Sequence, residues 1–335
     1  MKSIQYLGAN QLGIVDTSIP EIPQGWARIK VSHAGICGGD LNIYAGTHPR
    51  AKVSLIMGHE FSGILDSDAG KFKKGDPVAV FPLISCGNCT PCQTGNPHVC
   101  NTLGLYGIDN SGGMAEYAIV PQDALVPLPK ELSLRLGALI EPIAVAVHSV
   151  RDANFLPGDN AIVLGAGPIG LCTALVLRTF GARDVVVVEN DLKRLALAEE
   201  MGFETFNPDK SDLLAFVKSK TDDNGYDYIY DCAGAPAFTL ILFDLVKARG
   251  QIVIVAAYKK PAEFPFFKGM LKEARIVFVR VYRRKDFDIA SQLAAEEPLF
   301  DKIITHELPV EKAQEGFDLI LTKGTGAVKV MYKFD

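Results

Sequence analysis

The chain has 335 residues, of which 48% are hydrophobic, and a formal net charge of -5. Because a single hydrophobic core rarely grows past about 250–300 residues, we expect two domains. Acidic residues outnumber basic ones by 39 to 34, which leaves no basic surplus to neutralise phosphates and argues against nucleic acid as a partner.

The opening residues and one long uncharged stretch bear on where the protein works. Met1 to Gln5 contain neither an apolar core nor an Arg/Ser-rich leader, so nothing marks the chain for export and we expect a cytoplasmic protein. Residues 160–177 carry no charge and are long enough to suggest a membrane helix. Three glycines and a proline between positions 165 and 170 break this stretch, so we expect no membrane segment.

The N-terminal half contains short β-branched runs, such as 27–31 and 77–81, and frequent glycines, so we expect it to be mostly β. Cys37 lies there in a glycine-flanked turn, and His59 and Glu60 follow Gly58 further along the chain. One thiolate, one imidazole and one carboxylate suit a catalytic zinc, which keeps three protein ligands and one open position.

Four cysteines on a loop rich in Gly, Pro and Asn form the next motif: Cys86, Cys89, Cys92 and Cys100, spaced C-x2-C-x2-C-x7-C. In a chain without a leader, cysteines are expected to be metal ligands or buried thiols rather than disulfides. Four thiolates fit a closed tetrahedral zinc site, which has a structural role. An iron–sulfur cluster is the competing interpretation, but the fourth spacing differs and no Cys-Pro dipeptide follows.

A dinucleotide-binding motif begins the second half. Residues 161–164 are typical of a buried strand, which leads directly into Gly165-Ala166-Gly167-Pro168-Ile169-Gly170 and a predicted helix over 171–180. The glycines let the backbone approach a pyrophosphate, and the helix N-terminus offers free N–H groups and the positive end of its dipole. Further strands at 184–188, 226–231 and 251–257 continue the pattern and predict a doubly wound α/β domain.

The cofactor preference depends on Glu189, which ends the strand after the glycine motif. At that spacing a carboxylate binds both ribose hydroxyls of NAD, and it would repel the 2′-phosphate of NADP. Lys193 and Arg194 follow on a helix expected to begin near Asp191. Arg194 is a candidate cofactor contact. Lys193 or Arg194 could offset the repulsion between Glu189 and a 2′-phosphate, but both residues also fit solvated surface charges. The sequence favours NAD.

A series of motifs in order along almost the whole chain resembles the zinc-dependent medium-chain dehydrogenases. Within that family the chain is most similar to the polyol dehydrogenase branch, which includes sorbitol, L-threonine and galactitol-phosphate dehydrogenases. The motifs are Gly35-Ile36-Cys37-Gly38, Gly58-His59-Glu60, the four cysteines, Gly112-Gly113-Met114-Ala115-Glu116-Tyr117, Glu141-Pro142, the glycine motif at 165–170, and Val328-Lys329-Val330.

The resemblance implies a particular domain arrangement. A GroES-like, mostly-β catalytic domain is expected from residues 1–148 and 291–335, with a structural zinc lobe at about 84–102. A Rossmann domain that binds NAD is expected over 149–290, inserted between the two ends of the chain. Two zinc ions per chain, one catalytic and one structural, and a homo-oligomer, either a dimer or a tetramer, are also implied.

The resemblance also implies roles at the catalytic zinc. Cys37 and His59 would be ligands, Glu60 a third ligand or its exchange partner, and Glu141 a carboxylate that binds the metal directly or through water. Glutamate in Glu141-Pro142, where liver-type alcohol dehydrogenases have cysteine, indicates the polyol branch. Glu141 stands in the apolar run 136–147, where an unpaired buried carboxylate is costly, so a metal or a hydrogen-bonded water is its expected partner.

Substrate contacts follow from the resemblance as well. Tyr44, His48 and Arg50 are expected to border the substrate cleft, and Arg50 could pair with a carboxylate or phosphate, although it also fits a solvated loop charge. Tyr282 and Arg283 fill, in reverse order, an Arg-Tyr pair that contacts polyol hydroxyls in relatives; a solvated basic cluster is the alternative. A neutral polyol is the first expectation, and an anionic sugar derivative the second.

Two positions depart from the family pattern, because Gly39 stands where relatives have Ser or Thr and Asn42 where they often have histidine. The usual proton relay is therefore missing, and Glu60, a zinc-bound water or His48 could replace it. The expected function is a zinc- and NAD-dependent oxidoreductase that oxidises a secondary hydroxyl of a polyol or sugar derivative to a ketone. A non-catalytic, NAD-responsive binding protein is the competing hypothesis, although the retained ligand set argues against it.

Overall fold

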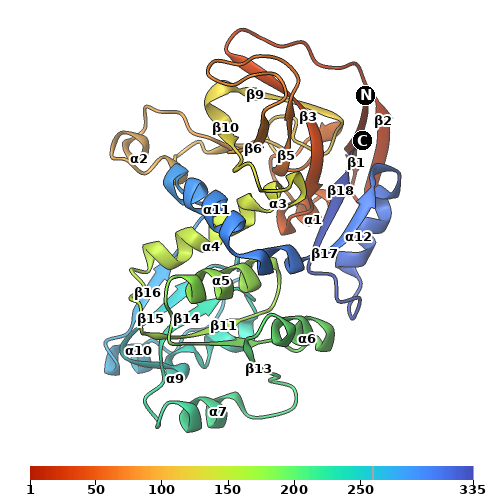
Figure 1. The fold of residues 1–335 in the computed structure, drawn as a ribbon. Helices are drawn as coiled ribbons and strands as arrows, with labels where there is room; N and C mark the ends of the chain where they lie inside the picture. Colours follow the sequence, from red (N-terminus) through yellow and green to blue (C-terminus); the bar gives the residue numbers. More distant parts are fainter. Residues whose placement is uncertain (259, 335) are drawn as a thin grey trace. The chain divides into compact units, whose positions relative to one another are not determined.

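The computed structural model describes residues 1–258 and 260–334, and these divide into two compact units (Figure 1). Unit 1 contains Met1–Ala144 and Tyr282–Asp335, and unit 2 contains Val145–Val281. Both ends of the chain therefore build unit 1. The predicted Rossmann segment extended to residue 290, but helix α11 (Arg284–Glu296) groups with unit 1, because its Phe287 packs against Phe81 with ring centroids 5.6 Å apart.

The described part of unit 1 contains a seven-stranded sheet in the order β10-β6-β5-β3-β18-β17, with β9 also paired to β3. Its strands are β3 (Trp26–Gly35), β5 (Glu60–Leu65), β6 (Pro77–Val80), β9 (Tyr117–Pro121), β10 (Leu125–Pro127), β17 (Ile304–Pro309) and β18 (Lys329–Lys333). Strand β18 pairs antiparallel with the end of β3, with Met331 opposite Gly35, so that the C-terminal segment completes the N-terminal sheet. In β3, alternate residues such as Ala27, Ile29 and Val31 are buried, as expected for a sheet with one face on the core.

Smaller elements surround this sheet. A three-stranded sheet has the order β2-β1-β4, and a two-stranded ribbon pairs β7 with β8. These strands are β1 (Lys2–Gly8), β2 (Gln11–Asp16), β4 (Leu55–Ile56), β7 (Leu83–Ile84) and β8 (Gly104–Leu105). The helices are α1 (Gly38–Tyr44), α2 (Thr90–Gln93), α3 (Leu134–Gly137), α4 (Ile140–Asp152, which continues into unit 2), α12 (Ala313–Leu321) and the 3₁₀ turns η1 (Pro97–Val99), η2 (Gln122–Ala124), η3 (Pro298–Ile303) and η4 (Val310–Lys312).

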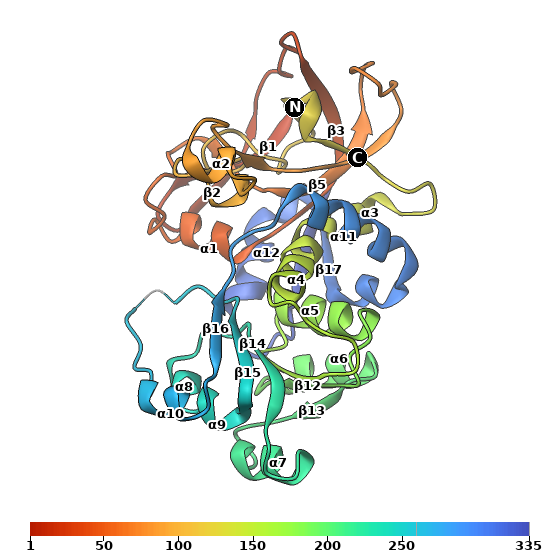
Figure 2. The same cartoon turned by 90° about the vertical axis from the view of Figure 1, so that its left-hand side faces the viewer.

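Unit 2 is built on a parallel sheet, most of whose strands are labelled in Figure 2. Its described strands have the order β13-β12-β11-β14-β15-β16. The strands are β11 (Asn160–Leu164), β12 (Asp184–Val188), β13 (Glu204–Phe206), β14 (Tyr226–Asp231), β15 (Val246–Ile254) and β16 (Arg275–Phe278). The helices are α5 (Pro168–Thr179), α6 (Leu192–Glu200), α7 (Leu213–Lys220), α8 (Pro236–Thr239), α9 (Leu242–Leu245) and α10 (Phe266–Leu271). The central strands are almost entirely buried, so both faces of the sheet need helical cover.

The strand order of unit 2 marks its ligand-binding edge. From β11 the chain first adds β12 and β13 on one side and then β14, β15 and β16 on the other. In such sheets, ligands bind at the carboxyl ends of the strands where this reversal occurs, here β11 and β14. The predicted strand at 251–257 ends earlier, at Ile254, because the N–H groups of Val255 and Ala256 both donate to the carbonyl of Asp231 and the ladder stops there.

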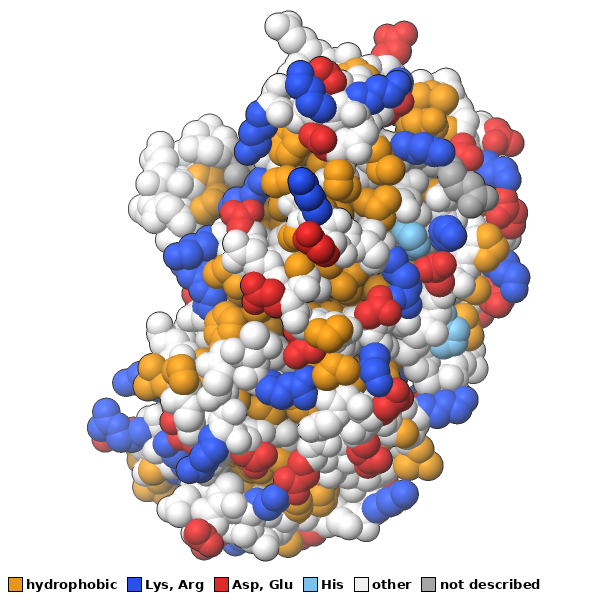
Figure 3. Space-filling model, in the orientation of Figure 1, with side chains coloured by type: hydrophobic (Ala, Val, Ile, Leu, Met, Phe, Trp, Pro, Cys, Tyr) orange, Lys and Arg blue, Asp and Glu red, His pale blue; other side chains and the backbone are white. Residues whose placement is uncertain are grey.

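Charged side chains of both signs are mixed on one face of the molecule. On the face drawn in Figure 3, Lys and Arg side chains lie interspersed with Asp and Glu side chains rather than gathered in one basic patch. In the described part of the chain, no helix combines the length and the apolar character that crossing a membrane requires.

Candidate active site

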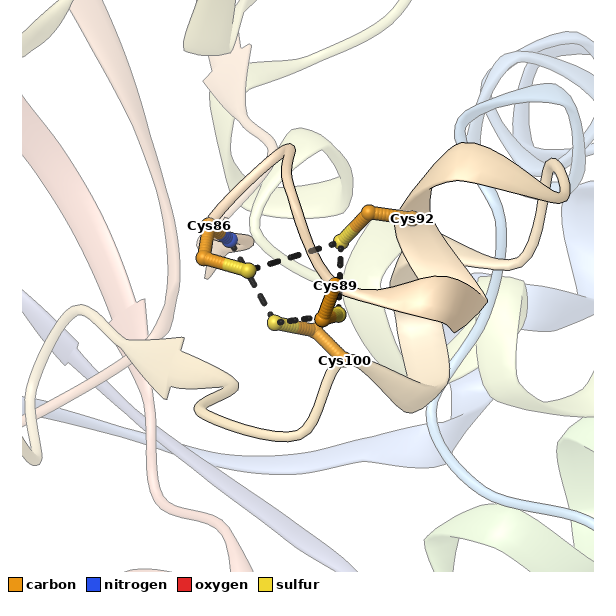
Figure 4. A group of neighbouring side chains, drawn as sticks. All are labelled: Cys86, Cys89, Cys92 and Cys100. Carbon is orange, nitrogen blue, oxygen red and sulfur yellow. Dashed lines mark hydrogen bonds between the residues drawn. The ribbon is translucent and has the colours of Figure 1, made fainter.

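The four cysteines of the predicted structural zinc lobe converge on one point (Figure 4). The Sγ atoms of Cys89 and Cys92 are 3.4 Å apart, those of Cys89 and Cys100 are 3.8 Å apart, and those of Cys86 and Cys92 are 4.0 Å apart. The backbone N–H groups of Cys86 and Thr102 point at the Cys100 sulfur, an arrangement that favours a thiolate. The described cysteines are all free thiols, so this group fits a closed four-thiolate zinc site.

A second donor group contains Cys37, His59 and Glu60, whose ligand atoms lie within 4.8 Å of one another. Strands β3 and β5 bring them together, because Gly35 at the end of β3 is paired with Glu60 at the start of β5. Gly58 has φ +90°, a conformation that favours glycine, and this turn delivers His59 and Glu60 to the site. His59 and Glu60 are 4% and 1% exposed, whereas Cys37 is half-buried.

Two further charged side chains enclose this donor group. Asp40, which is fully buried, forms a capping box at the start of α1, where its Oδ2 accepts a hydrogen bond of 2.9 Å from the Cys37 N–H. Lys329 on β18 is 2% exposed and donates to both carboxylate oxygens of Glu60, at 2.8 and 2.6 Å, and to the Ile36 carbonyl. Burial alone would lower the pKa of Lys329, but the Glu60 carboxylate outweighs burial and raises it.

The donor group fits a zinc ion. Among the described residues, neither His59 Nδ1 nor Asp40 Oδ1 has a hydrogen-bond partner, although both atoms are buried. Burial alone would lower the pKa of His59, but the charges of Cys37, Asp40 and Glu141 raise it well above its ordinary value. A half-buried thiol with a buried imidazole and carboxylate, among several acidic groups, provides the mixed, three-ligand set of an open zinc site.

Glu141 lies in the first turn of α4, beside this group but not in it. Its Oε1 accepts a hydrogen bond of 2.7 Å from the hydroxyl of Tyr282, and both side chains are buried. Burial raises the pKa of Glu141 to about 7. Among the described residues at this site, the ligand atoms of Cys37, His59 and Glu60 are mutually close, and Glu141 is not part of that group. The Glu141 carboxylate is bound to Tyr282 instead.

In unit 2, the glycine motif has the geometry of a phosphate-binding turn. Gly165 has φ +101°, and a side chain at Gly170 would collide with the Gly165 carbonyl, so both positions require glycine. A Cβ at Gly167 would meet nothing within 4 Å, which leaves its backbone open to a ligand. Pro168 and Ile169 then begin α5, with Gly167 as its N-cap.

Glu189 is bound to the same turn. Its Oε2 accepts from the N–H of Ala166 at 2.9 Å, and its Oε1 accepts from the N–H groups of Asn190 and Asp191. Asp191 caps α6 through the N–H groups of Lys193 and Arg194, so the helix begins where it was predicted to begin. The carboxylate therefore lies at the carboxyl end of β12, directly beside the glycine turn.

Comparisons with known proteins agree with both units. The family model for the alcohol dehydrogenase GroES-like domain matches residues 23–130, and that for zinc-binding dehydrogenases matches residues 168–296. The chain is 34% identical over 299 residues to 2-dehydro-3-deoxy-L-galactonate 5-dehydrogenase of Pseudoalteromonas atlantica, covering 88% of this chain and 87% of the relative. The chain belongs to the zinc-binding dehydrogenase family.

Solved structures support the same assignment for this dehydrogenase over its whole length. The alcohol dehydrogenase RspB from Escherichia coli CFT073, solved with NADH, has a TM-score of 0.91 and 30% identity and covers 100% of this chain and 99% of its own. The 2R,3R-butanediol dehydrogenase of Bacillus subtilis has a TM-score of 0.93 and 30% identity with the same coverage. The predicted fold class, a GroES-like domain plus a Rossmann domain, is confirmed, as is an oxidoreductase that uses zinc and NAD.

The predicted substrate contacts of the dehydrogenase have partners of their own. Tyr44 is buried against Phe317, and its hydroxyl accepts from Gln314 at 3.0 Å. Arg50 forms an ion pair of 3.1 Å with Asp109 and donates to the Leu103 carbonyl.

The remaining two predicted contacts, like Arg50, have hydrogen-bond partners within the protein. The His48 ring accepts from the Arg50 N–H at 3.4 Å. Arg283 is the N-cap of α11, where its N–H donates to Asp286, and its guanidinium donates to Asn96 at 3.3 Å.

Gly39, one of the two departures from the family pattern, is the second residue of α1. A Cβ at this position would lie 3.7 Å from His59 Cε1 and 3.9 Å from Cys37 Sγ, which is ordinary van der Waals contact. The dehydrogenase therefore lacks the usual hydroxyl although the site has room for it. Asn42, the other departure, lies one turn further along α1, where its carbonyl accepts from Thr47 and His48.

Sequence reasoning missed two residues of this site, Asp40 and Lys329. Asp40 had a signal, since it stands three residues after Cys37 in the spacing of a capping box. Lys329 had one too, because a single cation inside the apolar strand around Val328 and Val330 requires a buried counter-charge. The signal at Lys329 does not identify its partner, because Glu60 lies far away in the sequence.

Proposed function

We propose that this dehydrogenase oxidises a secondary hydroxyl of a polyol or sugar derivative to a ketone, with zinc held by Cys37, His59 and Glu60. The observation that carries this proposal is the buried mixed donor set with Glu141 beside it. The relatives support the substrate class, because one is named for a sugar acid that it oxidises at position 5 and another for a secondary diol. The non-catalytic alternative rests on the missing hydroxyl at Gly39, and the retained donor set of Cys37, His59 and Glu60 argues against it.

The residues around the donor set and the glycine turn have different roles in the proposed reaction. When bound, zinc supplies Lewis acidity toward the alcohol oxygen, and NAD supplies the acceptor for the hydride. Lys329 holds both oxygens of Glu60 and so fixes that carboxylate in the donor set. Asp40 fixes the backbone of Cys37 and adds negative charge near His59. The glycine turn and the N-terminus of α5 take the pyrophosphate.

We propose a neutral polyol rather than an anionic sugar derivative as the substrate. The cation that an anionic substrate would need, Arg50, is already paired with Asp109 and with the Leu103 carbonyl. A sugar acid remains the second candidate, since the relative from Pseudoalteromonas atlantica is named for one.

Arg50→Ala tests the charge of the substrate. We expect kcat/KM for sorbitol-like polyols to change less than about threefold, or about 0.6 kcal/mol, because Arg50 is bound to Asp109 and the Leu103 carbonyl rather than to a neutral substrate. The assay compares neutral polyols, hexonates and sugar-alcohol phosphates on the wild type and on the variant. The neutral assignment fails if the anionic compounds are the better wild-type substrates and Arg50→Ala lowers turnover of those alone.

Glu189 supports NAD rather than NADP. Its carboxylate lies beside the glycine turn and would repel a 2′-phosphate. Glu189→Gln removes the charge and keeps one carbonyl acceptor, which can serve either the Ala166 N–H or the N–H groups of Asn190 and Asp191. We expect the ratio of NAD to NADP affinity, measured by titration calorimetry, to fall about tenfold, on the order of 1.4 kcal/mol. Tighter binding of NADP than of NAD by the wild type would overturn the assignment.

We propose that the protein is a homo-oligomer, a dimer or tetramer, whose copies meet at the outer strand of unit 2. Strand β16 has one neighbour, β15, among the described strands, so its other edge is unpaired. Large apolar side chains are exposed on β16 and on α10 just before it: Phe266 at 73%, Phe267 at 69%, Met270 at 63%, Leu271 at 68% and Phe278 at 73%. An unpaired strand edge beside exposed apolar side chains can pair with the same edge of a second copy about a two-fold axis.

Phe278→Asp tests this interface. We expect sedimentation velocity to show a shift of at least one association step, from dimer to monomer or from tetramer to dimer, because the charge would be buried between copies. Leu192→Asp is the control, since Leu192 is 57% exposed on α6 of the same unit, outside β16 and α10. A monomeric wild type, or equal dissociation of the oligomer by both variants, would contradict the proposal.

A cytoplasmic location of the protein stays a prediction.

A further inference from the structure

Tyr282 is a tyrosine with no exposed surface, and its hydroxyl is bound to a carboxylate. The hydroxyl donates to Glu141 Oε1 at 2.7 Å, and Glu141 itself is 7% exposed. The family resemblance implied that Tyr282 contacts the substrate. The structure instead gives its polar atom a partner inside the protein.

The ring of Tyr282 is fixed by two other aromatic rings. Phe81 presents its edge at 5.7 Å, and Phe287 packs at 5.6 Å with a tilt of 52°. Phe81 and Phe287 also contact each other at 5.6 Å. In a closed three-ring cluster of this kind the tyrosine has no free rotamer, so the direction of its hydroxyl is set by packing.

The backbone on either side of Tyr282 is also constrained. Val281 has φ +46°, a conformation that a β-branched residue rarely adopts and that persists only where the surroundings impose it. On the other side, Arg283 is the N-cap of α11, and its N–H donates to Asp286 Oδ2 at 2.9 Å. Tyr282 therefore lies between a strained residue and a helix N-cap, and both fix its backbone where its side chain meets Glu141.

We infer that Tyr282 is a positioning residue that holds Glu141 outside the ligand set of the catalytic metal. The donor atoms of Cys37, His59 and Glu60 are mutually close, whereas Glu141 is not among them. One Glu141 oxygen is engaged by the tyrosine, which prevents the carboxylate from turning freely toward the donor set. Without that hydrogen bond, the buried carboxylate would have to find another partner, and the metal is the strongest one nearby.

This inference rests on the proposed function only in assuming that Cys37, His59 and Glu60 hold a metal. It makes no assumption about the substrate or the proton route. It predicts that the role of Tyr282 depends entirely on Glu141, which separates it from a merely structural tyrosine.

The test replaces zinc with cobalt in the full chain and records the visible absorption spectrum, which reports the number and type of cobalt ligands. The spectrum of Cys37→Ser is subtracted to remove the contribution of the four-cysteine site. We expect Tyr282→Phe to change the remaining bands, with the loss of intensity that accompanies an added carboxylate ligand. In a Glu141→Ala background, Tyr282→Phe should change nothing further.

Tyr332→Phe is the matched control, because Tyr332 is equally buried in unit 1 but its hydroxyl donates to the Ala313 carbonyl. It should leave the cobalt bands unchanged. The inference is overturned if Tyr282→Phe leaves the bands as they are in the wild type, or if it shifts them equally with and without Glu141. If the wild type and Cys37→Ser give the same cobalt spectrum, the metal assignment fails and this inference fails with it. If the wild type shows the expected cobalt bands but turns over no substrate, only the proposed function is contradicted.

Discussion

Cys37→Ser is expected to lower kcat/KM by at least about a thousandfold while the protein stays folded. A metal acting as a Lewis acid contributes several kcal/mol to transition-state stabilisation, and about 4 kcal/mol corresponds to a factor of about a thousand. Cys37 is half-buried at the N-terminus of a short helix, so serine, itself a good N-cap, preserves the local structure. NADH absorbance measures the turnover, and metal analysis should show one zinc per chain instead of two.

Cys89→Ser is the matched control for this prediction. It also removes one thiolate and one zinc, but from the closed four-cysteine site, whose sulfurs converge without an open position. We expect a melting temperature lower by about 3–4 °C, since an unfolding entropy of about 2.1 cal/mol/K per residue makes a loss of about 2–3 kcal/mol shift a chain of this size by that much. If Cys37→Ser unfolds the protein while Cys89→Ser removes only activity, the two roles have been exchanged.

In the metal-free protein, Lys329→Met should destabilise unit 1 by about 3–5 kcal/mol, because Glu60 would then keep a buried charge with neither zinc nor a lysine to balance it. Lys329 is 2% exposed, Glu60 is 1% exposed, and the ammonium contacts both carboxylate oxygens. Methionine preserves the packing of the lysine stem. Urea unfolding followed by the fluorescence of Trp26, the single tryptophan, reports on this unit directly.

The double variant Lys329→Met with Glu60→Gln distinguishes charge from packing. Removing both charges leaves neutral groups of similar volume, so more than half of the lost stability should return. If the double variant is as unstable as Lys329→Met alone, the lysine acts through its packing, and Glu60 does not need its charge balanced by Lys329.

The features of this protein that could be predicted from the sequence are those that depend on the spacing of residues within a short segment. The glycine motif, Glu189 and the four cysteines lie within short segments, so their chemistry follows from the residues themselves, and the structure brings each group together. Cys37 and His59 lie further apart in sequence, yet the flanking glycines indicated the two turns that carry them.

The features that could not be predicted from the sequence are contacts between segments that lie far apart in the chain. Lys329 reaches Glu60, and Tyr282 reaches Glu141, only because the C-terminal segment returns to complete unit 1. The same return explains the domain boundary, since α11 packs on Phe81 of the N-terminal segment. A sequence pattern marks such residues as unusual, but the choice of partner is made by the tertiary fold.

The most direct measurement is the appearance of NADH when the zinc-loaded protein is mixed with NAD and a panel of compounds that bear secondary hydroxyls. The panel includes neutral polyols, hexonates and sugar-alcohol phosphates, with primary alcohols for comparison. We predict turnover of at least one polyol or sugar derivative, with no comparable rate for Cys37→Ser. No turnover of any secondary alcohol, by protein that contains two zinc ions per chain and binds NAD, would contradict the assignment as an enzyme.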